Sequence, residues 1–174
     1  LSHYYDGDIL AAVTTGYKGD WTLSWAENHD YSELEKVLWV NTKGYESDTE
    51  YLIWVSLTYQ RCNVFKNVGG TWQLERSSIV ATGKPGTDTP VGVYKTTYKQ
   101  SGWFTPSYNC FPVVRFYEGT GYAFHSRLYQ PWSRTVLQDS RIGFPISLGC
   151  IRMYDEDIQW LYDNIPSDTT VVVY

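Results

Sequence analysis

The fold is decided by the stretch Tyr51–Tyr59, which reads Tyr51-Leu-Ile-Trp-Val-Ser-Leu-Thr-Tyr59. Its β-branched and aromatic side chains suit a pleated, buried surface, and their partial alternation is typical of a strand. The segment Cys62-Asn-Val-Phe-Lys66 continues this pattern, Asn67-Val-Gly-Gly70 is a turn signal, and Thr71–Thr82 has the composition of a returning strand. The sequence therefore predicts a β-sheet that begins at residue 51.

Further β-rich segments follow towards the C-terminus, and one helix interrupts them. Strands are expected at Pro90–Tyr98, at about 112–117, at about 121–126 and at Thr169–Tyr174. A helix is expected at about 156–164, capped by Asp155 and stopped by Pro166, because its apolar residues share one face. An aromatic content of 17% also favours strands. The predicted class is mostly β with one late helix.

The first 50 residues differ in charge from the rest of the chain. They carry 10 Asp or Glu and 3 Lys, hence −7, whereas the whole chain carries −5. This shift predicts a boundary near residue 50, with an acidic segment or linker at 1–50 and a domain at 51–174. Residues 1–30 have weak periodicity and are expected to be irregular or to be the tail of a preceding domain. The capping-box spacing of Ser32–Glu35 predicts one helix in this segment, at about 33–39.

Composition excludes several classes of function. No Lys/Arg stripe is present, which argues against nucleic-acid binding, and no apolar run reaches the roughly 18 residues that cross a bilayer. His3 and His29, in the acidic segment, are interpreted as exposed bystanders. Cys62, Cys110 and Cys150 lack zinc-site spacing, so neither a metal nor an organic cofactor is expected. Cys62 is expected in the core, and a Cys62–Cys110 disulfide stays open.

Two residues of the β-rich part have the chemistry of a base and a nucleophile. His125 ends the apolar strand Tyr122-Ala-Phe-His125, where a rigidly held ring can face a cleft. Cys150 follows Gly149, whose conformational freedom suits a thiol that points out of a tight turn. A nucleophilic thiolate needs a nearby base or cation. From the residues alone two interpretations stay open: a His125–Cys150 dyad, or Cys150 as a small buried apolar side chain.

The surroundings of these two residues carry a more specific pattern. His125-Ser126 is followed downstream by Ser147-Leu-Gly-Cys-Ile-Arg152. This resembles the signature of L,D-transpeptidases of the YkuD type: a His, a spacer, then Ser/Thr-His-Gly-Cys, a hydrophobic residue and Arg or Asn. Three further landmarks stand in the family's order, namely the opening strand Tyr51-Leu-Ile-Trp-Val, Thr89-Pro-Val-Gly-Val-Tyr94 and the tail Tyr162–Tyr174. The resemblance covers about 51–174 and implies an L,D-transpeptidase-like β-sandwich or barrel.

The resemblance also implies a mechanism. Cys150 attacks a peptidoglycan tetrapeptide stem and forms a thioester, terminal D-Ala is released, and an amine of a neighbouring stem accepts the acyl group. His125 is the general base, and Ser126 orients it through its backbone carbonyl. The backbone N–H groups of Gly149 and Cys150 are the expected oxyanion donors.

Other residues are expected to contact the substrate. Ser147 belongs to the signature, and Arg152 is suited to hold a carboxylate, although a structural ion pair under the Cys loop is an equal alternative. Tyr108, Trp103 and Trp132 are expected to line the stem-peptide groove or a lid, or else to dock on the core. The implied partners are stem peptides and carbapenem inhibitors. The chain begins at Leu1, so we interpret it as a processed or excised fragment. The resemblance implies an extracytoplasmic protein, wall-bound or secreted.

Two departures from the family pattern leave other functions open. Leu148 stands where the family has the His of Ser-His-Gly-Cys, and the spacer 126–146 is long, with an enlarged loop around Arg127–Arg134. An L,D-carboxypeptidase, with water as acceptor, shares every catalytic residue. A non-catalytic cell-wall binding module is the second alternative, suggested by Leu148 and the many aromatic residues.

Overall fold

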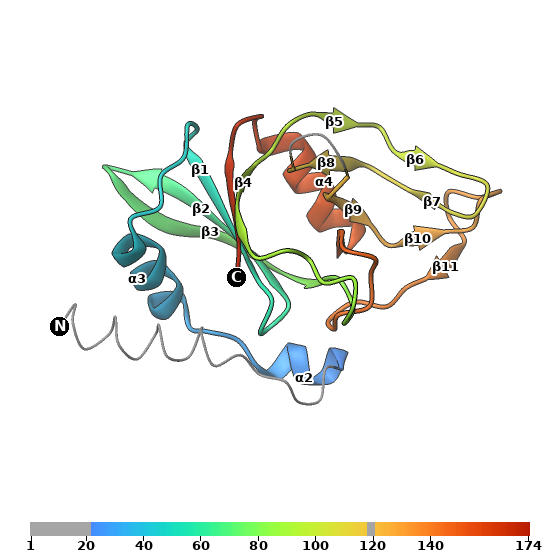
Figure 1. Cartoon of the computed structure of the whole chain (residues 1–174), viewed down its shortest axis with the longest axis horizontal. Helices are drawn as coiled ribbons and strands as arrows, with labels where there is room; N and C mark the ends of the chain where they lie inside the picture. The colour runs from blue at the N-terminus through green and yellow to red at the C-terminus, as the bar shows by residue number, and fades with distance from the viewer. Residues whose placement is uncertain (1–21, 118–120) are drawn as a thin grey trace.

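The computed structural model describes residues 22–117 and 121–174, and it contains two sheets and three helices in those ranges (Figure 1). The larger sheet has nine strands, in the spatial order β4 (Gly92–Lys95), β13 (Thr170–Val173), β1 (Tyr51–Ser56), β2 (Arg61–Val68), β3 (Thr71–Ala81), β12 (Ile151–Met153), β9 (Ala123–Ser126), β8 (Val113–Arg115) and β5 (Lys99–Gln100). The smaller sheet has the order β11 (Leu137–Asp139), β10 (Leu128–Tyr129), β7 (Asn109–Cys110) and β6 (Trp103–Phe104). The helices are α2 (Leu23–Asn28), α3 (Glu33–Lys43) and α4 (Asp155–Asn164). The mostly-β class is therefore confirmed, with α4 as the late helix.

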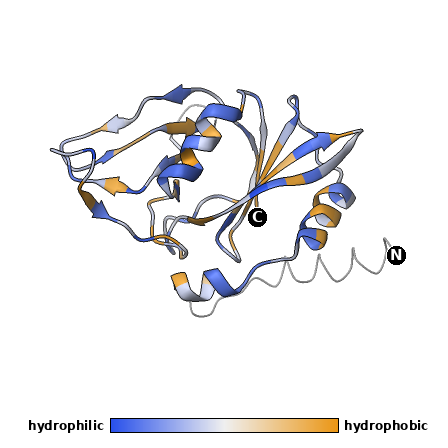
Figure 2. Ribbon diagram, turned by 180° about the vertical axis from the view of Figure 1, so that it is seen from behind, coloured by the Kyte–Doolittle hydropathy of each residue, from blue (hydrophilic) through white to orange (hydrophobic). Residues whose placement is uncertain are grey.

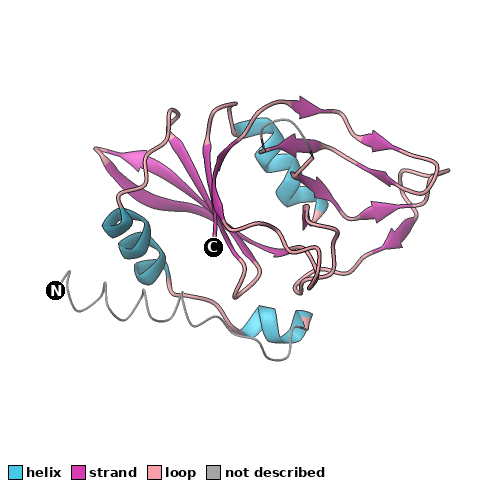
Figure 3. Cartoon of the chain, in the orientation of Figure 1, coloured by secondary structure: helices cyan, strands magenta, loops and turns pink. Residues whose placement is uncertain are grey.

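Strand β1 is buried along its whole length because both of its faces are covered. Ile53 and Val55 join the core cluster that includes α4, whereas Leu52 and Trp54 join the cluster that includes α3. Successive side chains of a strand point to opposite faces, so a strand covered on both sides is apolar throughout. Figure 2 shows apolar residues along the large sheet, and Figure 3 shows α3 and α4 on different sides of it.

Helix α3 begins where the capping box predicts. The Ser32 hydroxyl accepts a hydrogen bond from the Glu35 N–H at 3.2 Å, and the Ser32 N–H donates to the Glu35 carboxylate at 2.8 Å. The helix ends at Lys43, four residues beyond the expected end, because Gly44 is the first residue with a left-handed conformation (φ +70°). The added turn carries Asn41, whose side-chain amide donates to the backbone carbonyl of Trp72.

Helix α4 confirms the predicted late helix but corrects its cap. Tyr154 is the N-cap residue, it makes no side-chain capping bond, and Asp155 is the first helical residue. The Asp155 carboxylate instead accepts a hydrogen bond from the Tyr129 hydroxyl and lies 3.6 Å from Arg127. Its tertiary partners therefore lie on and next to the small sheet. Pro166 follows the helix end, as expected.

The acidic segment is more ordered near its end than its composition predicts. Thr22 caps the short helix α2 by accepting a hydrogen bond from the Trp25 N–H, and His29 stacks on Trp25 with 4.5 Å between ring centroids. The expectation for residues 1–21, which include His3, lies outside the described residues. Asp30 forms ion pairs with Lys36 at 2.6 Å and with Arg61 of β2 at 3.2 Å. The described part of the segment is thus attached to the sheet, while the predicted boundary near residue 50 stays a prediction.

Over the two described ranges, no helix is long and apolar enough to cross a membrane.

Candidate active site

The stretches that contain Cys150 and His125 lie next to each other because two short strands pair in parallel. Cys150 directly precedes β12, and β12 pairs with β9 in the register Ile151–Phe124 and Arg152–His125. His125 and Cys150 are 25 positions apart in sequence, yet the strand that contains His125 and the strand that follows Cys150 are neighbours in the large sheet.

His125 is held in one tautomer by its neighbour. Its Nδ1 lies 2.6 Å from the backbone oxygen of Ser126, and a carbonyl only accepts, so Nδ1 carries the proton and Nε2 is left as a base. The Trp103 ring packs against the imidazole, with 5.7 Å between centroids. The pKa of His125 is lowered from 6.5 to about 4, mainly by burial; the Ser126 carbonyl opposes this shift and the Arg152 charge adds to it. The imidazole is therefore neutral at pH 7.

The Cys150 thiol is half-buried and also uncharged. Its Sγ donates a hydrogen bond to the Gly121 carbonyl at 3.4 Å. Burial raises the pKa of Cys150, and the Ala123 backbone N–H and the Arg115 charge act in the opposite direction. In this structure the Cys150 thiol and the His125 imidazole are therefore both neutral at pH 7.

The loop before Cys150 is braced by hydroxyl groups. Ser147 Oγ donates to the Cys150 carbonyl at 2.6 Å and accepts from the Gly149 N–H at 3.1 Å. Thr89 Oγ1 donates to the Gly149 carbonyl at 2.8 Å, which explains why the Thr89-containing stretch accompanies the Cys motif. The Gly149 N–H, expected as an oxyanion donor, is thus engaged by Ser147. Ser147 bonds to backbone groups of its own loop.

Arg152, expected either to hold a substrate carboxylate or to form a structural ion pair, is paired with a carboxylate of the protein itself. It is buried, its Nη1 lies 3.1 Å from Asp139 Oδ2, and it contacts the Arg141 carbonyl at 3.4 Å. Arg141 also donates to both carboxylate oxygens of Asp139, at 2.9 and 2.7 Å. The Arg141 hydrogen bonds are the largest cause that holds the pKa of Asp139 below its usual range, with Arg152 contributing. Sequence reasoning missed Asp139, since nothing local marks it as the partner of Arg152.

The three aromatic candidates divide between two places. Trp103 lies against His125, and Tyr108 packs in the cluster that contains Cys110 and Cys150. Trp132 is 74% exposed and lines a separate depression with Phe104. The structure therefore brings Trp103 and Tyr108, but not Trp132, to the Cys150 cluster.

Leu148 and the other two cysteines have distinct positions. Leu148 is 78% exposed, so the residue that departs from the family pattern faces solvent. Cys62 is in the core, as predicted, and Cys110 is buried in the cluster against which Cys150 packs. All three thiols are free, which excludes the Cys62–Cys110 disulfide.

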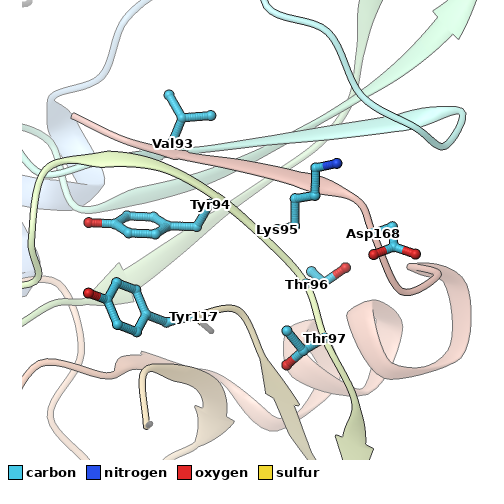
Figure 4. A pocket seen from close by; sticks show the side chains of 7 residues that line it. All are labelled: Val93, Tyr94, Lys95, Thr96, Thr97, Tyr117 and Asp168. Carbon is cyan, nitrogen blue, oxygen red and sulfur yellow. The ribbon is translucent and has the colours of Figure 1, made fainter. Parts of the chain in front are cut away.

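A cavity beside β4 does not have Cys150 in its lining. It has a volume of about 480 Å³ and is lined by β4 and the residues around it, including Tyr94, Lys95, Tyr117 and Asp168 (Figure 4). None of the expected site residues lines it. Within the described part of the chain no group of three or more His, Cys, Asp or Glu side chains is arranged to hold a metal ion.

The same stretch of chain that builds this site matches a known family. The model of the L,D-transpeptidase catalytic domain, YkuD, matches residues 50–173. The chain belongs to this family. No curated protein sequence matches the chain.

Solved structures share the fold at low sequence identity. A fused Zn-dependent amidase/peptidase/peptidoglycan-binding domain-containing protein from Clostridium acetobutylicum has a TM-score of 0.66 and 22% identity, over 82% of this chain and 59% of that one. An L,D-transpeptidase from Mycobacterium smegmatis has a TM-score of 0.56 and 23% identity, over 72% and 58%. L,D-transpeptidase 3 from Mycobacterium tuberculosis, in complex with a faropenem-derived adduct, has a TM-score of 0.53 and 21% identity, over 71% and 60%. The chain thus matches only part of the length of each.

Proposed function

We propose that the protein is a peptidoglycan L,D-transpeptidase with Cys150 as its nucleophile and His125 as its base. The observation that carries this proposal is the hydrogen bond from His125 Nδ1 to the Ser126 carbonyl. It leaves Nε2 as a proton acceptor on the strand that pairs with the one following Cys150. Family membership supplies the reaction class. The stem peptide as substrate and an extracytoplasmic location belong to the same proposal.

The first half-reaction forms a thioester. Nε2 of His125 takes the thiol proton as Cys150 Sγ attacks the carbonyl carbon of the third stem residue. The amide bond to the terminal D-Ala then breaks, and His125 returns the proton to the leaving amine. Because the Gly149 N–H is bound by Ser147, we assign the developing oxyanion to the Cys150 N–H; one such donor is worth about 3–4 kcal/mol.

The second half-reaction transfers the acyl group. An amine of a neighbouring stem attacks the thioester carbonyl, His125 accepts the amine proton, and the same proton returns to Cys150 Sγ as the carbon–sulfur bond breaks. Trp103 and Tyr108 are proposed to contact the stem peptide, because they lie at His125 and in the Cys150 cluster. Arg152, paired with Asp139, is proposed to support the strand of His125 rather than to bind substrate.

The test is covalent labelling of Cys150. The protein is incubated with faropenem, and separately with a disaccharide-tetrapeptide, and its intact mass is measured. We expect an acyl adduct that is absent in Cys150→Ala and retained in the control Cys62→Ala, which removes a thiol from the core instead. A folded protein without either adduct would contradict the proposal and favour a wall-binding module.

A second measurement separates transfer from hydrolysis. With the tetrapeptide and a free acceptor amine present, a transpeptidase yields a cross-linked product, whereas an L,D-carboxypeptidase yields only the tripeptide. We expect the cross-linked product to form.

A further inference from the structure

A depression on the small sheet lies on the face turned away from Cys150. It has a volume of about 310 Å³ and is lined by Phe104, Asn109, Pro131, Trp132, Ser133 and Arg134. In the pairing of β6 with β7, Trp103 lies opposite Cys110 and Phe104 lies opposite Asn109. Trp103 and Cys110 belong to the cluster that contains Cys150. Successive side chains of a strand point to opposite faces, so Phe104 and Asn109 lie on the face turned away from that cluster. We call this surface the outer depression.

The loop that presents Trp132 is firmly built. The side-chain amide of the buried Asn109 donates to the carbonyls of Gln130, Pro131 and Ser133, at 3.2, 3.3 and 3.0 Å. The Ser133 hydroxyl accepts from two further backbone N–H groups of the loop, at 3.0 and 2.9 Å. The backbone on either side of Trp132 therefore has its hydrogen bonds inside the protein.

This rigid loop holds a large apolar side chain in water. Trp132 is 74% exposed and Phe104 is 46% exposed. Exposed aromatic groups gathered in one depression mark a binding surface more often than scattered ones do, and Trp is enriched where binding energy concentrates. Ordering the loop in advance lowers the entropy that a ligand must offset on binding.

Arg134 gives the outer depression a positive charge. Its guanidinium lies 4.4 Å from the centre of the Phe104 ring and 6.0 Å from that of Phe111. It forms no ion pair with a carboxylate of the described residues. A planar cation resting on aromatic rings, with its donors free, suits a ligand that carries a carboxylate.

We propose that the outer depression binds a glycan strand that carries carboxylate-bearing substituents. The C–H face of a pyranose ring stacks on Trp132, and a carboxylate of the substituent pairs with Arg134. Peptidoglycan, whose sugars bear acidic peptide stems, has both features, and its choice as the ligand rests on the proposed function. Because the depression faces away from Cys150, binding there anchors the protein to the wall and leaves the reacting site free.

The proposal is tested by co-sedimentation of the protein with insoluble purified peptidoglycan. Trp132→Ala is expected to weaken binding about tenfold. Arg134→Gln is expected to weaken it about threefold and to reduce its dependence on salt. Leu34→Ala and Lys43→Gln are matched controls, because they remove an exposed apolar and an exposed basic side chain from α3; both should bind like the unmodified protein.

Three further readouts sharpen this test, and the first of them keeps it separate from the test of the proposed function. Faropenem labelling of Cys150 should be equal in all four variants, which also shows that they are folded. Trp132→Phe, which keeps an aromatic face, should restore most of the binding lost in Trp132→Ala. A neutral chito-oligosaccharide should bind in a Trp132-dependent and Arg134-independent manner.

Each outcome has a definite meaning. Wall binding that is equal in Trp132→Ala and in the controls would overturn the inference, as would binding that Lys43→Gln weakens as much as Arg134→Gln. Trp132-dependent wall binding without any Cys150 adduct would retain the inference and reject the proposed function.

Discussion

Gly149 shows how one residue positions the thiol. Its φ of +128° is a conformation that side chains rarely adopt, and a Cβ placed there would lie 2.5 Å from Cε1 of Tyr122. Since Cys150 follows directly, any shift of Gly149 moves Sγ. A glycine is needed here for two reasons, backbone conformation and the close approach of Tyr122.

Gly149→Ala is therefore expected to lower both stability and acylation. Strain of this kind costs about 1–3 kcal/mol, and the contact with Tyr122 adds to it. Gly86→Ala is the matched control, because Gly86 has a φ of +94° but a Cβ added to it would meet nothing within 4 Å. We expect acylation by faropenem to fall at least about tenfold in Gly149→Ala and to be unchanged in Gly86→Ala. If Gly149→Ala and Gly86→Ala changed the unfolding temperature and the labelling by equal amounts, the contact with Tyr122 would have no role.

At the scale of elements, the attachment of α3 depends on one carboxylate. Asp30 precedes α3 and neutralises two buried cations, Lys36 of that helix and Arg61 of β2. Lys36 Nζ also donates to the Ser77 hydroxyl of β3 at 2.9 Å. Burial lowers the pKa of both Lys36 and Arg61, and Asp30 opposes the change in each. Removal of Asp30 would leave the buried cations Lys36 and Arg61 without this carboxylate.

Asp30→Ala is expected to destabilise the fold by about 3 kcal/mol, because breaking a buried ion pair leaves an uncompensated charge. Chemical denaturation measures this change. Asp48→Ala is the control, since it breaks the exposed ion pair with Lys95 and should leave the unfolding midpoint nearly unchanged. A small effect of Asp30→Ala would mean that the ion pairs of Asp30 contribute little to the stability of the fold.

Some helices and strands could be predicted from the sequence and others could not. The capping box of Ser32 and the apolar run of β1 rest on short-range patterns, and both were found as expected. The strands of the small sheet were not predicted, because β6, β7 and β10 have two residues each and no period to detect. They exist through pairing with one another, which is a tertiary property.

At the scale of the whole molecule, the hydrophobic core includes residues that lie outside the stretch matched by the family model. The match begins at residue 50, yet Tyr31, Trp39 and Val40 share a buried cluster with Trp54 and other residues of the large sheet. The acidic composition of residues 1–50 predicts a boundary near residue 50, and that boundary stays a prediction, because charge says nothing of which side chains are buried. The described part of this segment contributes to the core of the fold.

The pH dependence of stability is a further property of the whole chain. The pKa of His125 is lowered from 6.5 to about 4 on folding, so between these values the unfolded chain binds more protons than the folded one. Stability therefore falls as pH decreases from 6.5 to 4, by at most about 1.4 kcal/mol per pH unit from this group. The positive charge of Arg152 contributes to this lowering of the His125 pKa, because it disfavours a protonated imidazole.

Urea unfolding at pH 4.5, 5.5 and 7 checks this expectation. The unfolding free energy of the unmodified protein should rise across the series, and His125→Gln should reduce the rise. At alkaline pH the sign reverses, because burial raises the pKa of Cys110 to about 12 and also raises that of Cys150. An identical slope in His125→Gln at acid pH would show that other groups cause it.

The sequence by itself determined the β-rich class, the late helix, the start of α3, and His125, Ser126 and Cys150 as candidates. These follow from periodicity, capping chemistry and motif, which act over a few residues. Only the tertiary structure decided that Ser147 engages the Gly149 N–H, that Arg152 pairs with Asp139, and that Trp132 faces away from Cys150. Those contacts depend on strand pairing between distant segments, and no local pattern encodes which partner a side chain meets.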